Sequence, residues 1–276
     1  MKYLKLLGLL FTLLLLTLIT QVGGILLLLS ILLFPLINKI TYQKTLKVFY
    51  KTALFICIYA LATFYIIPFI AIKTGRTALP ITETNHLKPL TFLTILLNRN
   101  YVKPELLKAV TTIALELNKK HPNSIVNYLD AGFPFMDGFP LLPHLSHNDG
   151  KKLDLAFCYK SAKTSQSSND CPSFIGYGIC EEPLVHEKNT AYFCANKGYW
   201  QYSFLKKIIP QGNKEYFQFD AIRTKTLVAL CVQNKSIAKI FIEPHLQNRL
   251  TLISPKIRFH GCQAVRHDDH IHIQLK

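Results

Sequence analysis

Acidic residues are scarce in this chain, and the first 82 residues contain none. The 276 residues include 16 acidic and 32 basic ones, which gives a net charge of +16 at pH 7. Only 17% of the residues are charged and 50% are hydrophobic, a composition that excludes an intrinsically disordered chain. Eight of the basic residues precede Glu83, the first acidic residue. The sequence therefore divides into an apolar first part and a moderately basic remainder that is long enough for one hydrophobic core.

Two long runs without any charge occupy the first part. One run of 33 residues ends before Lys39, and another of 21 residues ends before Lys73. Since a helix needs about 20 apolar residues to cross a bilayer core, the second run predicts one membrane span. The first run is too long for one untilted span or a cleaved secretory signal, and Gln21-Val22-Gly23-Gly24 near its middle favours a turn between two spans. Residues 1–75 are therefore predicted to be a transmembrane anchor of two to three helices.

Positive charge between the spans predicts their orientation. The stretch from Asn38 to Lys51 carries four lysines and no acidic residue, and loops of this kind stay in the cytoplasm. The last span then leaves the cytoplasm, so we expect residues 76–276 to form a domain outside the cytoplasmic membrane, in the periplasm. This location argues against a nucleic-acid partner, which the net charge alone would suggest. The sequence indicates no particular protein partner.

Six cysteines belong to the predicted outer domain: Cys158, Cys171, Cys180, Cys194, Cys231 and Cys262. In an oxidising compartment an even set of this kind predicts up to three disulfides, whose pairing the sequence leaves open. A thiolate zinc site is the alternative, but no close C-x-x-C pair is present, so disulfides are favoured. The stretch at about 158–198 is polar and rich in cysteine, and we expect it to be a disulfide-stapled insertion.

Hydrophobic spacing and turn residues predict the secondary structure of the outer domain. Apolar residues recur at helical spacing after Pro104, which suits the first position of a helix. Alternating or compact apolar runs predict strands elsewhere. The expected helices cover about 104–120, 220–232 and 244–250, and the expected strands cover about 125–129, 152–159, 237–242 and 270–275. This mixture predicts an α+β fold class, with a small antiparallel sheet and flanking helices.

Five of the ten histidines fall in two short motifs. The first motif is H-x-x-H-x(6)-D, and the second is H-x-x-H-x-H close to the C-terminus. Their members are His144, His147 and Asp154 in the first, and His267, His270 and His272 in the second. We interpret the five remaining histidines, His260 among them, as ordinary polar residues. A solvated histidine-rich surface that captures metal adventitiously is the alternative interpretation of the second motif.

The two motifs together offer the ligands that a catalytic zinc ion needs, namely three imidazole or carboxylate groups and an open position for water. His147 and Asp154 can supply two ligands, and Gly150 allows the turn between them. On a strand, His270 and His272 point to the same face, so one can bind metal while its neighbour reaches the substrate. His147, Asp154 and His272 therefore form a candidate zinc site, surrounded by the other three histidines of the motifs.

The pattern resembles a known group of enzymes. Ser146-His147-x-x-Gly150-x-x-x-Asp154, followed by His270-x-His272, is similar to the zinc peptidases that include D-alanyl-D-alanine carboxypeptidases, lysostaphin-type enzymes and the Hedgehog domain. The two additional histidines, one in each motif, are more similar to the penicillin-insensitive murein endopeptidases, as is the segment Ile240-Phe241-Ile242-Glu243-Pro244. The resemblance covers about residues 128–275, and it is specific in the spacing of the motifs alone.

The resemblance implies that His147, Asp154 and His272 bind Zn²⁺. It implies His270 and His267 as the catalytic residues, with His270 the first choice for proton transfer or oxyanion stabilisation, while His144 lines the site. The carboxypeptidase branch has a glutamate shortly before its final histidine; here His267, Asp268 and Asp269 occupy that region, which favours the endopeptidase branch and leaves the general base open.

The expected function is a membrane-anchored, zinc-dependent peptidoglycan hydrolase that cleaves an amide bond in stem peptides or cross-links. The cysteine-rich insertion and the spans depart from the soluble members of the group. A D-alanyl carboxypeptidase of the same group is one alternative, and a non-catalytic module that binds zinc or cell wall is another.

Overall fold

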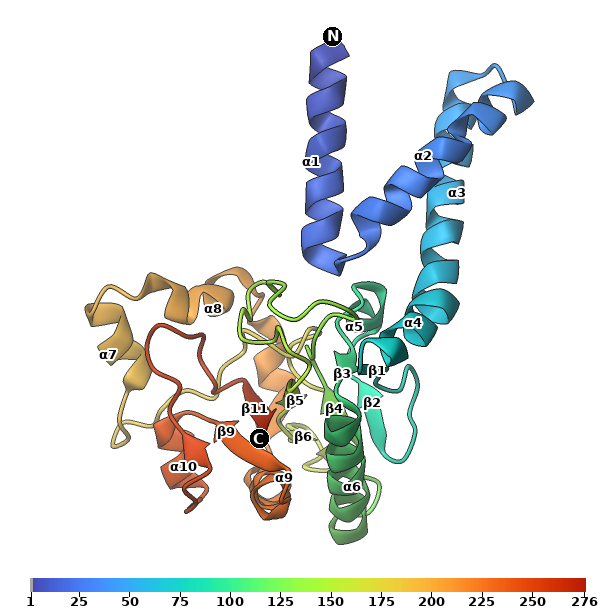
Figure 1. Cartoon of the computed structure of the whole chain (residues 1–276). Coiled ribbons are helices and arrows are strands. Elements are labelled where there is room, and N and C mark those ends of the chain that lie inside the picture. The colour runs from blue at the N-terminus through green and yellow to red at the C-terminus, as the bar shows by residue number, and fades with distance from the viewer. Residues whose placement is uncertain (1) are drawn as a thin grey trace.

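A computed structural model describes residues 2–276, and apolar helices form its N-terminal part (Figure 1). Three stretches are long and apolar enough to cross a membrane. They are α1 Lys2–Thr20, α2 Gly23–Ile40, and the continuous run of α3 Lys44–Leu61, the π-helix η1 Ala62–Ile66 and α4 Ile67–Lys73. The predicted turn separates α1 from α2, with Gln21 at a positive φ of 66°. The structure thus confirms that the first apolar run forms two helices, each long enough for one span.

The spans are attached to the globular part at one end. Val22 and Leu26 of the α1–α2 hairpin are buried in one cluster with Ile67 and with Tyr101 of the globular part. The backbone N–H of Phe135 donates a hydrogen bond to Oε1 of Gln21 (2.9 Å). The globular part therefore packs against both the hairpin turn and the helix through which the chain leaves the apolar region.

A six-stranded sheet forms the centre of the globular part (Figure 1). Its strands follow the order β10-β9-β11-β5-β4-β2. Their bounds are β2 Leu87–Pro89, β4 Val126–Tyr128, β5 Lys152–Ala156, β9 Ile237–Phe241, β10 Ile257–Arg258 and β11 His270–Leu275. β11 is antiparallel to β5 and β9, and β5 is antiparallel to β4. The outermost strands β2 and β10 run parallel to their neighbours.

The predicted α+β class is confirmed at this level, but the sheet is mixed and not wholly antiparallel. Parallel neighbours need a crossover connection. The crossover from β2 to β4 contains α5 Phe92–Leu96 and α6 Pro104–Lys120, and the one from β9 to β10 contains α10 Pro244–Arg249. The outer strands are short and lack a clear alternation, so the spacing of apolar residues did not predict them. A further two-stranded pair joins β1 Thr77–Ala78 to β3 Tyr101–Val102.

Two helices complete the hydrophobic core. α6 begins at Pro104 as predicted, and α9 Ala221–Gln233 begins after Asp220, whose side chain accepts a hydrogen bond from the backbone N–H of Arg223. N–H groups in the first turn of a helix have no partner within the helix, so a proline, which lacks an N–H, is tolerated there. In α9 the aspartate side chain caps one of these N–H groups. The two helices contact each other and bury their apolar faces against the sheet.

The segment after β5 differs from the prediction. The expected strand 152–159 is interrupted: β5 ends at Ala156, and β6 Tyr159–Ser161 belongs to a separate sheet with β7 Ser167–Ser168 and β8 Phe217–Phe219. The polar region that follows contains four short helices that the spacing did not predict. They are α7 Thr190–Asn196, η2 Trp200–Ser203, α8 Phe204–Ile208 and η3 Gly212–Tyr216.

The cysteines form fewer bonds than the maximum that their number allows. One disulfide joins Cys194 to Cys262, and it therefore ties the insertion to a later loop and not to itself. Within residues 2–276 the other five cysteines are free, and three of the free thiols are buried. Burial raises the pKa of Cys231 to about 12, so this thiol stays protonated and packs as a small apolar side chain.

Candidate metal centre

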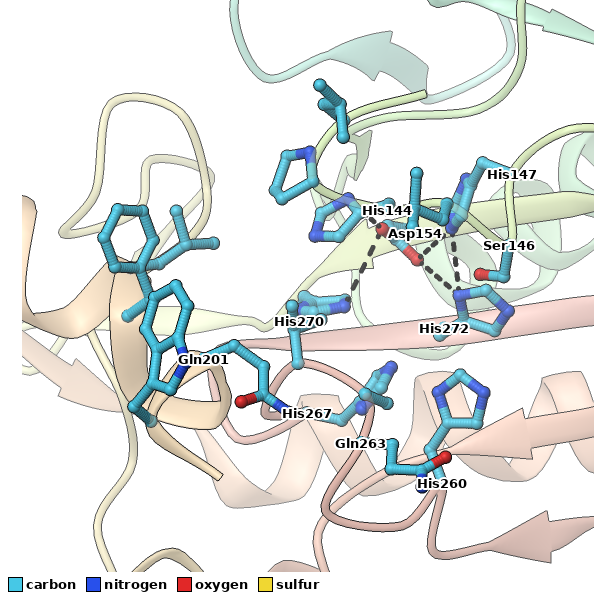
Figure 2. A pocket seen from close by; sticks show the side chains of 18 residues that line it. His144, Ser146, His147, Asp154, Gln201, His260, Gln263, His267, His270 and His272 are labelled. Carbon is cyan, nitrogen blue, oxygen red and sulfur yellow. Dashed lines mark hydrogen bonds and ion pairs between the residues drawn. The ribbon is translucent and has the colours of Figure 1, made fainter. Parts of the chain in front are cut away.

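The two central strands of the sheet carry the last residues of both histidine motifs: Asp154 lies on β5, and His270 and His272 lie on β11. His272 on β11 lies directly opposite Asp154 on β5, and His270 lies opposite Ala156. Because side chains two residues apart on a strand share a face, His270 and His272 project to the same side as Asp154 (Figure 2). All three side chains are buried. The antiparallel register therefore brings together residues that are 118 positions apart in the sequence.

The loop between β4 and β5 brings His144 and His147 to this face. The buried Arg76 guanidinium braces the loop at both ends, since it donates hydrogen bonds to the carbonyl oxygens of Phe133 and, at 3.3 Å, Asn148. Gly150 then turns the chain into β5 at a φ of +71°, a conformation that favours glycine, and a Cβ there would lie 3.3 Å from Arg76 Nε and 3.4 Å from the Lys103 backbone nitrogen. The expectation that a glycine makes this turn is confirmed.

Three potential ligand atoms converge at the centre of the site (Figure 2). His147 Nε2 lies 3.0 Å from His272 Nδ1 and 3.2 Å from Asp154 Oδ1, and His272 Nδ1 lies 2.9 Å from the same carboxylate oxygen. A tetrahedral zinc ion with bonds of about 2.0–2.2 Å holds its ligand atoms roughly 3.3–3.6 Å apart. The triangle is contracted from that spacing by a few tenths of an ångström, so the three groups fit a metal ion with small movements.

Neighbouring groups orient two of the three ligands as a metal would require. His147 Nδ1 donates to the carbonyl oxygen of Ala131 (2.7 Å), which leaves the lone pair of Nε2 directed at the centre. The hydroxyl group of Tyr177 donates to Asp154 Oδ2 (2.8 Å), which leaves Oδ1 facing the two imidazoles. His272 Nε2 is buried without a hydrogen-bond partner in the described part of the chain.

A second ligand set shares two of these residues. His144, His147 and Asp154 are all buried and offer ligand atoms within 4.8 Å of one another. His144 Nδ1 faces Oδ2 of Asp154 (3.3 Å) and Oδ2 of Asp130 (3.5 Å), so it stands on the other side of the carboxylate from His272. Neither ring nitrogen of His144 has a hydrogen-bond partner among residues 2–276. We favour the set with His272 because its three atoms are closer together and share one centre.

His270 is held by the residue that precedes it. Its Nδ1 bonds to the carboxylate of Asp269, whose other oxygen accepts a hydrogen bond from the backbone N–H of Gly178 (2.6 Å). This contact turns His270 Nε2 towards the centre, 3.7 Å from Asp154 Oδ2, and that nitrogen has no hydrogen-bond partner in the described residues. His270 thus presents one free nitrogen beside the ligand triangle.

Burial and charge set different protonation states for these neighbours in the metal-free protein. Burial lowers the pKa of His272 to about 3, so this imidazole is neutral. Burial opposes the charge of His270 as well, but Asp154 and Asp269 outweigh it and raise the pKa of His270 to about 9. Burial alone would raise the pKa of Asp154, yet His147 and His270 hold it well below its usual value. The ionised carboxylate of Asp154 therefore has a neutral imidazole, His272, and a cationic one, His270, as neighbours. Burial opposes the charge of His147 too, but Asp154 raises the pKa of His147.

The site lies at the bottom of a cavity of about 570 Å³. His267 lines this cavity, and its backbone is fixed to Glu243 by two hydrogen bonds of 3.0 and 3.2 Å. Apolar side chains line much of the rest of this cavity, namely Leu142, Leu145, Trp200, Phe204, Leu205 and Val265. A cavity of this size and composition suits a small polar substrate segment with an apolar part.

Sequence reasoning missed several residues of the site. His260, interpreted as an ordinary polar residue, lines the cavity and stacks on Phe241 with ring centroids 4.1 Å apart. Tyr177 and Asp130 reach the site from segments without a motif, so no spacing could have identified them. Asp269 stood within the second motif, and its contact with His270 depends on the local backbone. Comparisons with protein family models and with characterised proteins find no match to this chain.

Proposed function

We propose that this protein is a membrane-anchored, zinc-dependent peptidoglycan hydrolase that cleaves an amide bond in stem peptides or their cross-links. The observation that carries the proposal is the triangle of His147 Nε2, Asp154 Oδ1 and His272 Nδ1, with edges of 2.9–3.2 Å. Two imidazoles and one carboxylate, with room for water on the cavity side, are typical of catalytic zinc sites in hydrolases. The motif spacing supports the assignment to murein endopeptidases.

The residues around this centre have different proposed roles. The chemistry that zinc supplies in such a set is polarisation of a carbonyl group and a lower pKa for water. His270 Nε2 is free and oriented by Asp269, so His270 is the group that we assign to proton transfer or to stabilising negative charge on the substrate oxygen. His144 and His267 line the cavity beside it and are assigned to contacts with the peptide.

The charge of the outer part supports a substrate with free carboxylates. Of the 32 basic residues eight precede Glu83, so 24 basic and 16 acidic residues remain from that point on. A basic surface attracts acidic peptides over several ångströms before contact. Stem peptides of peptidoglycan carry such carboxylates, and three helices able to cross a membrane would hold the site beside the wall.

Metal analysis and product analysis on the purified full chain test this proposal. We expect about one zinc ion per chain and hydrolysis of cross-linked muropeptides that stops with a chelator and returns with zinc. Release of terminal D-alanine from uncross-linked muropeptides alone would assign the carboxypeptidase reaction in place of the endopeptidase reaction. Bound metal without hydrolysis of either substrate would overturn the proposed enzymatic activity and would favour a non-catalytic binding module. The absence of stoichiometric metal would overturn the metal centre itself.

A further inference from the structure

The segment of residues 188–209, here named the α7–α8 segment, has an unusual composition. It contains four lysines and no acidic residue, and it holds six aromatic residues, including Trp200, the single tryptophan of the chain. Basic residues alternating with tryptophan, tyrosine and phenylalanine are typical of helices that lie in the head-group region of a bilayer. The composition therefore points to a lipid surface and not to a second protein core.

The aromatic side chains of this segment are exposed. Trp200 and Tyr192 are each 67% exposed, and Phe193, Phe204 and Ile208 are exposed as well. The ammonium group of Lys197 lies over the ring of Phe193, 4.5 Å from its centroid. A protein surface in water seldom presents so many large apolar groups together unless another surface covers them.

The position of the segment indicates what covers it. In Figure 1 α8 lies at the edge of the globular part that faces the apolar helices, near the level of the α1–α2 turn, and α7 lies at the side of the globular part, next to this edge. The hydrogen bond between Phe135 and Gln21 fixes the globular part to that turn. Helices that cross a bilayer emerge at its head-group region, so a bilayer around these helices would have its surface next to this edge.

Two links attach the segment to the rest of the globular part. The disulfide between Cys194 and Cys262 ties α7 to the loop that contributes His260 and Gln263 to the cavity wall. The buried Tyr202 donates a hydrogen bond to Glu243. A preformed surface of this kind pays a smaller ordering cost when it binds.

We propose that the α7–α8 segment docks on an anionic phospholipid surface and thereby places the mouth of the cavity at the membrane. Trp200 and Phe204 line that cavity as well, together with Leu142 and Leu145, which are also exposed. This inference goes beyond the proposed hydrolase activity, because it rests on the spans and on the segment and needs neither metal nor catalysis.

The single tryptophan makes the test direct. The full chain is reconstituted in nanodiscs of phosphatidylcholine and phosphatidylglycerol that contain lipids with a nitroxide quencher near the head group or in the middle of the acyl chain. We expect a shift of the Trp200 emission to shorter wavelength relative to the denatured chain, and stronger quenching by the shallow label than by the deep one. Emission that neither label quenches, while soluble acrylamide quenches it freely, would overturn the proposal.

Charge variants test the lipid preference. Lys197→Glu/Lys207→Glu is expected to reduce the ratio of docked to undocked protein at least about tenfold, since each basic residue at an anionic surface contributes roughly a fivefold preference. The matched control is Lys119→Glu/Lys120→Glu in the last turn of α6, which lies beside α9 at the far end of the globular part (Figure 1). Equal loss of quenching in both variants would contradict a local lipid contact. The quenching of Trp200 is also measured in the presence of a chelator. Docking is expected to persist there, because it needs no metal, so the test of docking is independent of the proposed hydrolase activity.

Discussion

Asp154 and His272 are direct partners across the two central strands, with Oδ1 and Nδ1 2.9 Å apart. Strands in the middle of a sheet hold their side chains more precisely than loops do. The remaining proposed ligand, His147, comes from a loop that is braced by Arg76. The centre thus combines two positions that the sheet determines with one that a buried guanidinium determines.

Removal of a ligand from the sheet should remove the metal. We expect His272→Ala to lose stoichiometric zinc, because two remaining groups hold the ion poorly. His144→Ala should keep it, since His144 faces the other carboxylate oxygen, and the exposed His186→Ala is the folding control. Metal content by mass spectrometry and near-ultraviolet circular dichroism measure the two effects. Retention by His272→Ala together with loss in His144→Ala would assign the set His144, His147 and Asp154.

Asp269 should act through His270. Asp269→Asn is expected to keep the metal and to lower kcat about 10–100-fold, because the imidazole loses the carboxylate that orients it. His270→Ala should keep the metal and lose at least as much rate. In the double variant the two losses should not add, since both remove the same oriented nitrogen. Additive losses, or full activity of His270→Ala, would contradict the assigned role.

Arg76 should stabilise the loop that carries His144 and His147. Arg76→Leu leaves the carbonyl oxygen of Phe133 without its hydrogen-bond partner and removes the ion pair with Asp137, while the Asn148 oxygen keeps its bond from the backbone N–H of Gly138. We expect a loss of about 2–4 kcal/mol in the free energy of unfolding. Zinc affinity should fall in the same variant. Arg258→Leu, an exposed position, is the control. Denaturant titration and metal titration check both effects, and unchanged zinc affinity in Arg76→Leu would show that the loop is held by other contacts.

Stability should decrease with rising pH through the titration of Glu243. Burial, reinforced by the charge of Asp268, raises the pKa of Glu243 to about 7 from its ordinary 4.5. Between these values the folded protein binds the proton more tightly than the unfolded chain, so folding is favoured below pH 4.5 and this contribution is lost as the pH rises through 7.

Glu243→Gln should remove that part of the pH dependence, worth up to about 3 kcal/mol, because the amide oxygen can still accept from Tyr202. Apparent melting temperatures at pH 5 and pH 8 measure the change, with the exposed Glu215→Gln as control. A pH dependence that is equal in wild type and Glu243→Gln would contradict the raised pKa.

Local patterns determined much of the fold from sequence. The apolar runs, the turn at Gln21 and the helix that begins at Pro104 depend on hydrophobic spacing and on residues with restricted backbone angles, which act over a few positions. The two histidine motifs identified six side chains that the structure brings to one face. By contrast, the short helices of residues 190–216 and the parallel edge strands depend on packing partners far away in the chain, so their own residues did not predict them.

Only the tertiary structure decided which atoms meet. The sequence placed Asp154 and His272 on separate strands, but the register between those strands put Oδ1 and Nδ1 in contact, and register depends on the whole core. The same holds for Asp269 as the partner of His270, for His260 in the cavity wall, and for the pairing of Cys194 with Cys262. Chemistry of the side chains is a local property of the sequence, whereas distances between them result from the free energy of the entire fold.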